Sequence, residues 1–132
     1  MSRKHLDVVR QALEAVRTCD EIQATELFDP DAEWHNTSVF PGERVWRGPQ
    51  AIIAFWRTFS EAYAEGGTKI ERYRESERWV VAGFHSWGRG RASGAPLDVR
   101  WAAIFELRDR RVTRVEVHGS YAEAIEAAEL RA

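Results

Sequence analysis

Cysteine and long apolar runs are both scarce in this sequence. Its only cysteine, Cys19, cannot form a disulfide within the chain or a zinc site made of several thiolates. No segment approaches the roughly 18 consecutive apolar residues of a membrane span, and the N-terminus has no apolar stretch of signal-peptide length. We therefore expect no membrane association and, because a lone thiol suits a reducing compartment, a cytoplasmic protein.

An excess of positive charge is also absent. Lys and Arg total 19 against 21 Asp and Glu, for a net charge of −2, whereas binding to a phosphate backbone favours a basic excess. The sequence contains no HExxH pattern, no calcium-binding loop and no paired-histidine spacing. We therefore expect no nucleic-acid partner and no metal, and the chemistry considered below needs no cofactor.

Bulky apolar residues, by contrast, are abundant enough for an ordered interior. The chain has 132 residues, of which 44% are hydrophobic, and it contains six Trp, six Phe and three Tyr. A chain of this length forms one compact domain around one core. No internal repeat or low-complexity tract divides it. We expect a single domain that spans residues 1–132.

Apolar residues recur at helical intervals in three N-terminal segments. The first predicted helix covers residues 4–18. The second begins after the N-cap Asp20 and ends at the turn residues 29–31, and the third begins at Pro49 and ends at the glycine pair 66–67. The apolar side chains of the first helix are Leu6, Val9, Leu13 and Val16, and those of the third are Ile52, Phe55, Trp56, Phe59 and Tyr63.

The rest of the sequence alternates with a period of two, which is typical of strands. A short strand is expected at 32–37, followed by an irregular loop at 38–48 that contains a brief extended piece at Val45-Trp46. Ser120 and Glu123 have the spacing of a capping box, which predicts a closing helix over residues 121–130. Four further strands, arranged as an antiparallel meander, are predicted at 69–77, 79–89, 97–107 and 112–118.

Helices grouped before such a meander predict an α+β fold. In the strand 97–107, apolar side chains such as Trp101 and Phe105 fall on one face, while Asp98 and Arg100 fall on the other. We expect the apolar face to curve around the helices. A curved antiparallel sheet wrapped in this way forms a cone with an internal pocket at its open end.

Four segments of the sequence resemble a known family. They are Asp29–Trp34 (DPDAEW), Trp46–Pro49 (WRGP), Gly88–Gly94 (GRGRASG) and Ala124–Ala128 (AIEAA). In this order and with these separations they resemble bacterial SnoaL-like proteins of the ketosteroid-isomerase-like, or nuclear transport factor 2-like, superfamily. The resemblance covers nearly the whole chain and implies a cystatin-like α+β cone. The same scaffold hosts isomerases, hydrolases, cyclases and binding proteins, so it does not specify the activity.

The resemblance also allows the catalytic positions of known members to be compared. The positions that match the ketosteroid isomerase base and its two oxyanion donors hold Asn36, Ala12 and Ala103. Asn36 cannot take a proton, and neither alanine can donate a hydrogen bond. Limonene-epoxide-hydrolase-like members place a Tyr and an Asn where this chain has Trp34 and Asn36. Their Asp–Arg–Asp arrangement falls near His85, Trp87 and Val117. Neither reaction route is therefore expected.

Two polar residues are the predicted catalytic groups. His85 is a general base if Val81, Gly83 and His85 face the pocket, because imidazole titrates near neutral pH. A shift of one residue places Ala82, Phe84 and Ser86 inside instead, and the sequence leaves both registers open. Asn36 is predicted to orient a substrate oxygen, with Trp34 two residues earlier on the same face as an aromatic wall.

Two functions from different classes follow from these residues. The first is binding of a small, largely apolar, polycyclic metabolite, with or without an isomerase-, cyclase- or lyase-type proton transfer. The alternative is a non-catalytic module with a packed cavity, which forms a homodimer through Arg100, Ala102 and Ile104 on the exposed sheet face. The predicted ligand-binding residues are Trp34, Asn36, Trp56, Phe59, His85, Trp87, Trp101, Ala103 and Val117.

Overall fold

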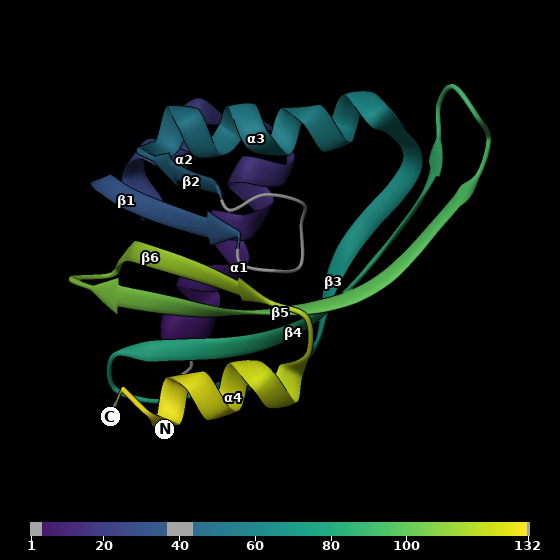
Figure 1. Cartoon of the computed structure of the whole chain (residues 1–132). Helices are drawn as coiled ribbons and strands as arrows, with labels where there is room; N and C mark the ends of the chain where they lie inside the picture. Colours follow the sequence, from purple (N-terminus) through teal and green to yellow (C-terminus); the bar gives the residue numbers. More distant parts are fainter. Residues whose placement is uncertain (1–3, 37–43, 132) are drawn as a thin grey trace.

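The computed structural model describes residues 4–36 and 44–131, so the predictions for Thr37 and for loop residues 38–43 lie outside the described residues. It shows an α+β fold in which four helices pack on a curved six-stranded sheet (Figure 1). The elements in chain order are α1 (Lys4–Arg17), α2 (Glu21–Leu27), β1 (Phe28–Asn36), β2 (Arg44–Arg47), α3 (Pro49–Ala62), β3 (Tyr63–Glu75), β4 (Trp79–Gly90), β5 (Pro96–Arg108), β6 (Arg111–His118) and α4 (Tyr121–Glu129).

Helix capping explains where the helices begin. The side chain of Asp20 accepts a hydrogen bond from the backbone amide of Gln23 at the start of α2, and Ser120 accepts one from Glu123 at the start of α4. Pro49 occupies the first turn of α3, where no amide hydrogen is needed. None of the helices in residues 4–36 and 44–131 has the length and apolar character to cross a membrane.

The turn-forming residues 29–31 and 66–67, which the sequence predicts to end the second and third helices, lie in strands instead. β1 begins at Phe28 and continues through residues 29–31, where its pairing with β6 shifts register. α3 ends at Ala62, before the glycine pair 66–67, which lies inside β3. At Gly66 the backbone of β3 passes so close to the carbonyl oxygen of Trp87 that a Cβ atom has no room. These glycines therefore allow close strand packing rather than ending a helix.

The sheet contains the predicted antiparallel meander and one additional parallel pair. Strands β3 to β6 pair in sequence order, and β1 joins the sheet parallel to β6, with β2 beyond it. In the described residues the outer strands β2 and β3 do not pair with each other, so the sheet curves without closing into a barrel. β3, β4 and β5 extend well past the helices and bend toward the end of α3 (Figure 1).

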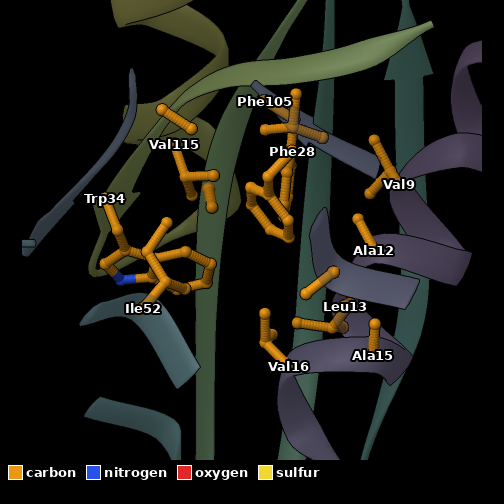
Figure 2. Close-up of a cluster of buried hydrophobic side chains, with 14 of the residues drawn as sticks. Val9, Ala12, Leu13, Ala15, Val16, Phe28, Trp34, Ile52, Phe105 and Val115 are labelled. Carbon is orange, nitrogen blue, oxygen red and sulfur yellow. The ribbon is translucent and has the colours of Figure 1, made fainter. Parts of the chain in front are cut away.

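The two faces of the sheet carry separate apolar clusters. Helices α1, α2 and α3 cover one face, where Phe28, Trp34 and Phe105 are almost completely buried, and Figure 2 shows their side chains converging with those of α1. Each such large side chain stabilises the fold by about 1.5–3 kcal/mol relative to an exposed one. Helix α4 covers the opposite face, where it packs on Val81, Ala102 and Ile104.

The position of α4 corrects the predicted contact between two chains. Ala102 and Ile104 are fully buried beneath α4, and of the predicted contact residues only Arg100 is exposed. The sequence suggests an exposed face because the small and charged residues of α4 do not indicate which face of the sheet the helix covers. A homodimer stays a prediction, and Ala102 and Ile104 do not form its interface while α4 remains in place.

Candidate functional site

A cavity of about 650 Å³ lies between α3 and the inner face of the long strands β3, β4 and β5. This volume is within the range of about 300–1,000 Å³ that is typical of small-molecule sites. The walls also include the ends of β1 and β6. The lining side chains that the argument below uses are Trp34, Asn36, Phe59, Thr68, Ser86 and Trp101.

Aromatic rings from separate elements form most of the inner wall. On α3, Phe59 lies four residues after Phe55 and three after Trp56, so its ring neighbours both of theirs on one side of the helix. The ring of Trp56 lies 5.7 Å from that of Trp34 on β1, edge to face, and 6.2 Å from that of Trp101 on β5. Contacts of this geometry hold the rings in defined orientations, so the wall is rigid and apolar.

Most of the predicted ligand-binding side chains meet at this cavity. Ala103 does not line it, since it is fully buried in the apolar cluster beside Ala82. Trp87 is 39% exposed and packs over Gly67 at the rim. The predicted residues that line the cavity are Trp34, Asn36, Trp56, Phe59, Trp87, Trp101 and Val117. Their role in binding a ligand remains a prediction.

His85 is placed on the opposite face of the sheet from the one required of a cavity base. Its Nε2 lies 2.6 Å from Oδ1 of Asp98, and it is not among the residues that line the cavity. Phe84 and Ser86 point inward instead, so the second register is the one that the structure adopts. Because α4 buries the other face of β4, both faces are apolar and their alternation does not reveal the register. The predicted placement of His85 in the pocket is wrong.

Asn36 is held in one orientation by its neighbour on β1. Its side chain is 3% exposed, and its Oδ1 accepts a hydrogen bond of 2.9 Å from Nε1 of Trp34. The two residues are two apart on a strand, so they share a face. Asn36 lines the cavity, and its amide nitrogen is a donor only, so a contact of this nitrogen with a ligand oxygen is a donated hydrogen bond.

Two hydroxyl groups on neighbouring strands add a second polar position. Thr68 on β3 and Ser86 on β4 are paired across the sheet, and their oxygens lie 2.8 Å apart. Nε1 of Trp101 donates to the Ser86 oxygen at 2.9 Å. Thr68 is not predictable from the sequence, because its position opposite Ser86 depends on the register of two strands whose pairing is interrupted by bulges.

The charged residues that line this cavity are Arg17, Glu65, Arg91 and Arg100. Glu65, the carboxylate among the described lining residues, has a side chain that is 80% exposed. The hydrogen bond from Arg100 lowers the pKa of Glu71, and the same bond raises the pKa of Arg100. Arg91 donates through Nε and Nη2 to the backbone oxygen of Ser60, near the end of α3. The interior therefore offers hydrogen-bond donors and aromatic surface rather than a buried base.

No cluster of metal ligands accompanies these groups in the part of the chain that the structure describes. There, no three His, Cys, Asp or Glu side chains lie close enough together to hold a metal ion. The described lining residues supply aromatic surface, hydroxyl and amide groups, and the charged groups named above.

Comparisons with solved structures show the same fold in several proteins. An NTF2-like protein of unknown function from Burkholderia pseudomallei is 21% identical, with a TM-score of 0.73 over 96% of this chain and 97% of that one. A putative SnoaL-like polyketide cyclase from Jannaschia sp. is 17% identical, with a TM-score of 0.75 over 94% and 90%. TerC, co-crystallised with polyporic acid, is 17% identical, with a TM-score of 0.71 over 93% and 98%.

Comparison by sequence identifies the family. Among curated proteins none matches significantly. The family model of the SnoaL-like domain matches residues 9–115. This range covers the helices α2 and α3 and most of the sheet. The structural neighbours, which include NTF2-like and ketosteroid-isomerase-like proteins, have the fold that this match implies. The chain belongs to the SnoaL-like domain family.

Proposed function

We propose that this protein binds a small, flat, largely apolar metabolite in the cavity between α3 and the long strands. The observation that carries the proposal is the convergence of Trp34, Trp56 and Trp101 from separate elements on one space of about 650 Å³. Indole rings bind flat aromatic surfaces by stacking and by apolar burial. That TerC was co-crystallised with polyporic acid supports a ligand in a protein of this fold.

The cavity volume favours binding over the alternative of a packed module. A packed interior has few spaces larger than a water molecule, whereas this one has room for a drug-sized compound. The donors at Asn36 and Ser86 add polar groups that fix the orientation of a ligand, as polar groups do in other small-molecule sites.

Proton-transfer catalysis receives less support than binding. A general base must lie within hydrogen-bond reach of the proton that it removes. Among the described lining residues the carboxylate is Glu65, at the exposed rim, and His85 is on the other side of the sheet. Asn36 is able to stabilise a substrate oxygen, but the described interior supplies no base to work with it.

Calorimetric titration with a panel of flat aromatic ketones tests the proposal. We expect at least one member to bind with a dissociation constant in the micromolar range. We expect Phe59→Ala, which removes a lining ring, to weaken that binding about tenfold. Trp79→Phe is the matched control, because Trp79 packs on the α4 side of the sheet and should leave the affinity unchanged. No binding across the panel, or equal losses in the two variants, would contradict the proposal.

A further inference from the structure

We infer that the hydroxyl pair of Thr68 and Ser86, supported by the indole of Trp101, is a hydrogen-bond donor that selects ligands with a carbonyl or phenolate oxygen at their edge. This inference rests on the proposed function and adds to it the chemical class of the ligand. The three side chains come from adjacent strands β3, β4 and β5, and all three line the cavity.

The hydrogen bonds within this group use the indole N–H and one of the two hydroxyl protons, so the other hydroxyl proton remains for a ligand. The indole N–H of Trp101 goes to the Ser86 oxygen at 2.9 Å, and one hydroxyl proton is used in the 2.8 Å bond between Ser86 and Thr68. Whichever hydroxyl donates in that bond, the other keeps its own O–H. In the described residues neither hydroxyl has a further partner. The group therefore presents a donor at the cavity wall.

The indole bond also strengthens the donor. Because the Ser86 oxygen already accepts from Trp101, its own O–H is polarised toward stronger donation. A ligand acceptor such as a carbonyl oxygen takes the proton that remains in the group and extends the row of hydrogen bonds that begins at the indole N–H. The group is therefore a stronger donor to a carbonyl oxygen than an isolated hydroxyl is.

The position of Trp101 is fixed from two sides. Its ring stacks on that of Phe84 with centroids 4.3 Å apart and planes inclined by 25°, and its Nε1 is held by Ser86. The hydroxyls therefore lie at the edge of a fixed aromatic plane. A flat ligand that packs on the free part of this wall brings its own edge toward the hydroxyls, so an edge oxygen is within their reach.

Fluorenone and fluorene form a suitable pair of probes, since they have the same shape and differ in one carbonyl. We expect the wild-type protein to bind fluorenone about tenfold more tightly than fluorene, the size of effect given by one hydrogen bond to a carbonyl. In the double variant Thr68→Val/Ser86→Ala, the two affinities should become equal through a loss for fluorenone alone. Thr25→Val, on the exposed surface of α2, is the control for a lost hydroxyl and should keep the tenfold preference.

An infrared measurement adds a readout that a purely structural role of the hydroxyls does not affect. The carbonyl stretch of bound fluorenone should lie at lower frequency in the wild-type protein than in the double variant, because a hydrogen bond weakens the C=O bond. If the double variant does not fold, Trp101→Phe replaces it. That variant keeps both hydroxyls but removes the N–H that polarises them, and it should move the stretch part of the way back.

The outcomes separate this inference from the proposed function. Equal binding of both probes by the wild-type protein, or a preference that survives in the double variant, overturns the hydroxyl donor and leaves the ligand cavity intact. A wild-type protein that binds neither probe overturns the inference, and it overturns the proposed function as well when the whole panel of aromatic ketones also fails to bind. A preference that disappears with the hydroxyls, together with the shift of the carbonyl stretch, supports the inference.

Discussion

Two buried tryptophans at the cavity differ in whether their indole N–H has a partner. Nε1 of Trp34 donates to Oδ1 of Asn36 at 2.9 Å. Nε1 of Trp56 is buried and has no hydrogen-bond partner among the residues that the structure describes. A buried donor without a partner lowers the stability of the fold by about 1–3 kcal/mol. When one member of a buried hydrogen-bonded pair is removed, the group left without its partner lowers the stability by a similar amount. The same substitution should therefore have different effects at the two sites.

We predict that Trp34→Phe lowers the free energy of unfolding by about 1–3 kcal/mol more than Trp56→Phe does. Both changes remove the same volume of indole. The first leaves the Asn36 oxygen buried without its donor, and the second removes a donor that has no partner. Urea unfolding of both variants measures the difference, and equal losses would show that the hydrogen bond to Asn36 contributes nothing.

Glu116 on β6 is a second residue whose environment predicts a measurable effect. Burial opposes ionisation of its carboxyl, but the hydrogen bond with His118 and the positive charges of Arg131 and Arg114 outweigh burial and hold its pKa below the ordinary value of 4.5. A carboxyl with a lowered pKa in the folded state stabilises the fold above the pKa of the unfolded chain. That contribution is lost as the pH falls through the folded-state pKa.

Glu116→Gln should therefore destabilise the protein near neutral pH and lose this effect in acid. The difference in unfolding free energy between the wild-type protein and the variant should be largest at about pH 7 and shrink below about pH 4. Glu126→Gln, at an exposed position on α4, is the control and should show a smaller difference at neutral pH. A Glu116→Gln difference that is constant from neutral pH to acid would refute the role of the carboxylate charge.

At the scale of elements, a charge placed between α4 and the sheet should destabilise the fold. Ala124 is fully buried against Val81, Ala102 and Ile104, while Ala122 on the same helix is exposed. A buried unpaired carboxylate costs several kcal/mol, because the low-dielectric interior disfavours its charge. We expect Ala124→Glu to destabilise the protein by about 2–4 kcal/mol and Ala122→Glu by less than about 0.5 kcal/mol, as measured by urea unfolding. Equal effects would mean that α4 is not packed on the sheet.

The elements also show what local pattern is able to predict. The apolar stripe of α1 is read directly from the sequence because only one side of that helix is buried. The orientation of β4 cannot be predicted from its apolar pattern, since Val80 and Val81 are both buried, one on each face of the sheet. Its alternation carries no information about which face holds His85 and which holds Ser86.

The residues of the candidate site also fall into a group that the sequence predicts and a group that it does not. The aromatic residues of α3 are predictable because helical spacing alone brings Phe55, Trp56 and Phe59 to one face. The pairing of Thr68 with Ser86 is not, because it depends on bulges in β3 and on a strand that replaces the expected end of α3. Non-local strand pairing therefore accounts for the part of the site that the sequence does not reveal.

At the scale of the whole molecule, the two apolar clusters share the same strands. Ala102 and Ile104 point toward α4, while Ala103 and Phe105 on the same strand point toward the other helices. A strand that leaves one cluster must leave the other, because its side chains alternate between the faces. The layers on the two sides of the sheet should therefore lose their structure together.

We predict a single cooperative unfolding transition, which fluorine NMR of protein labelled with 5-fluorotryptophan measures on both sides of the sheet at once. Trp34 reports on the cluster under α1–α3 and Trp79 on the cluster under α4, and Trp34→Phe and Trp79→Phe assign their signals. Both native signals should disappear with the same urea midpoint. Midpoints that differ, with the Trp79 signal lost first, would show that α4 unfolds independently and that its side of the sheet is a separate cooperative unit.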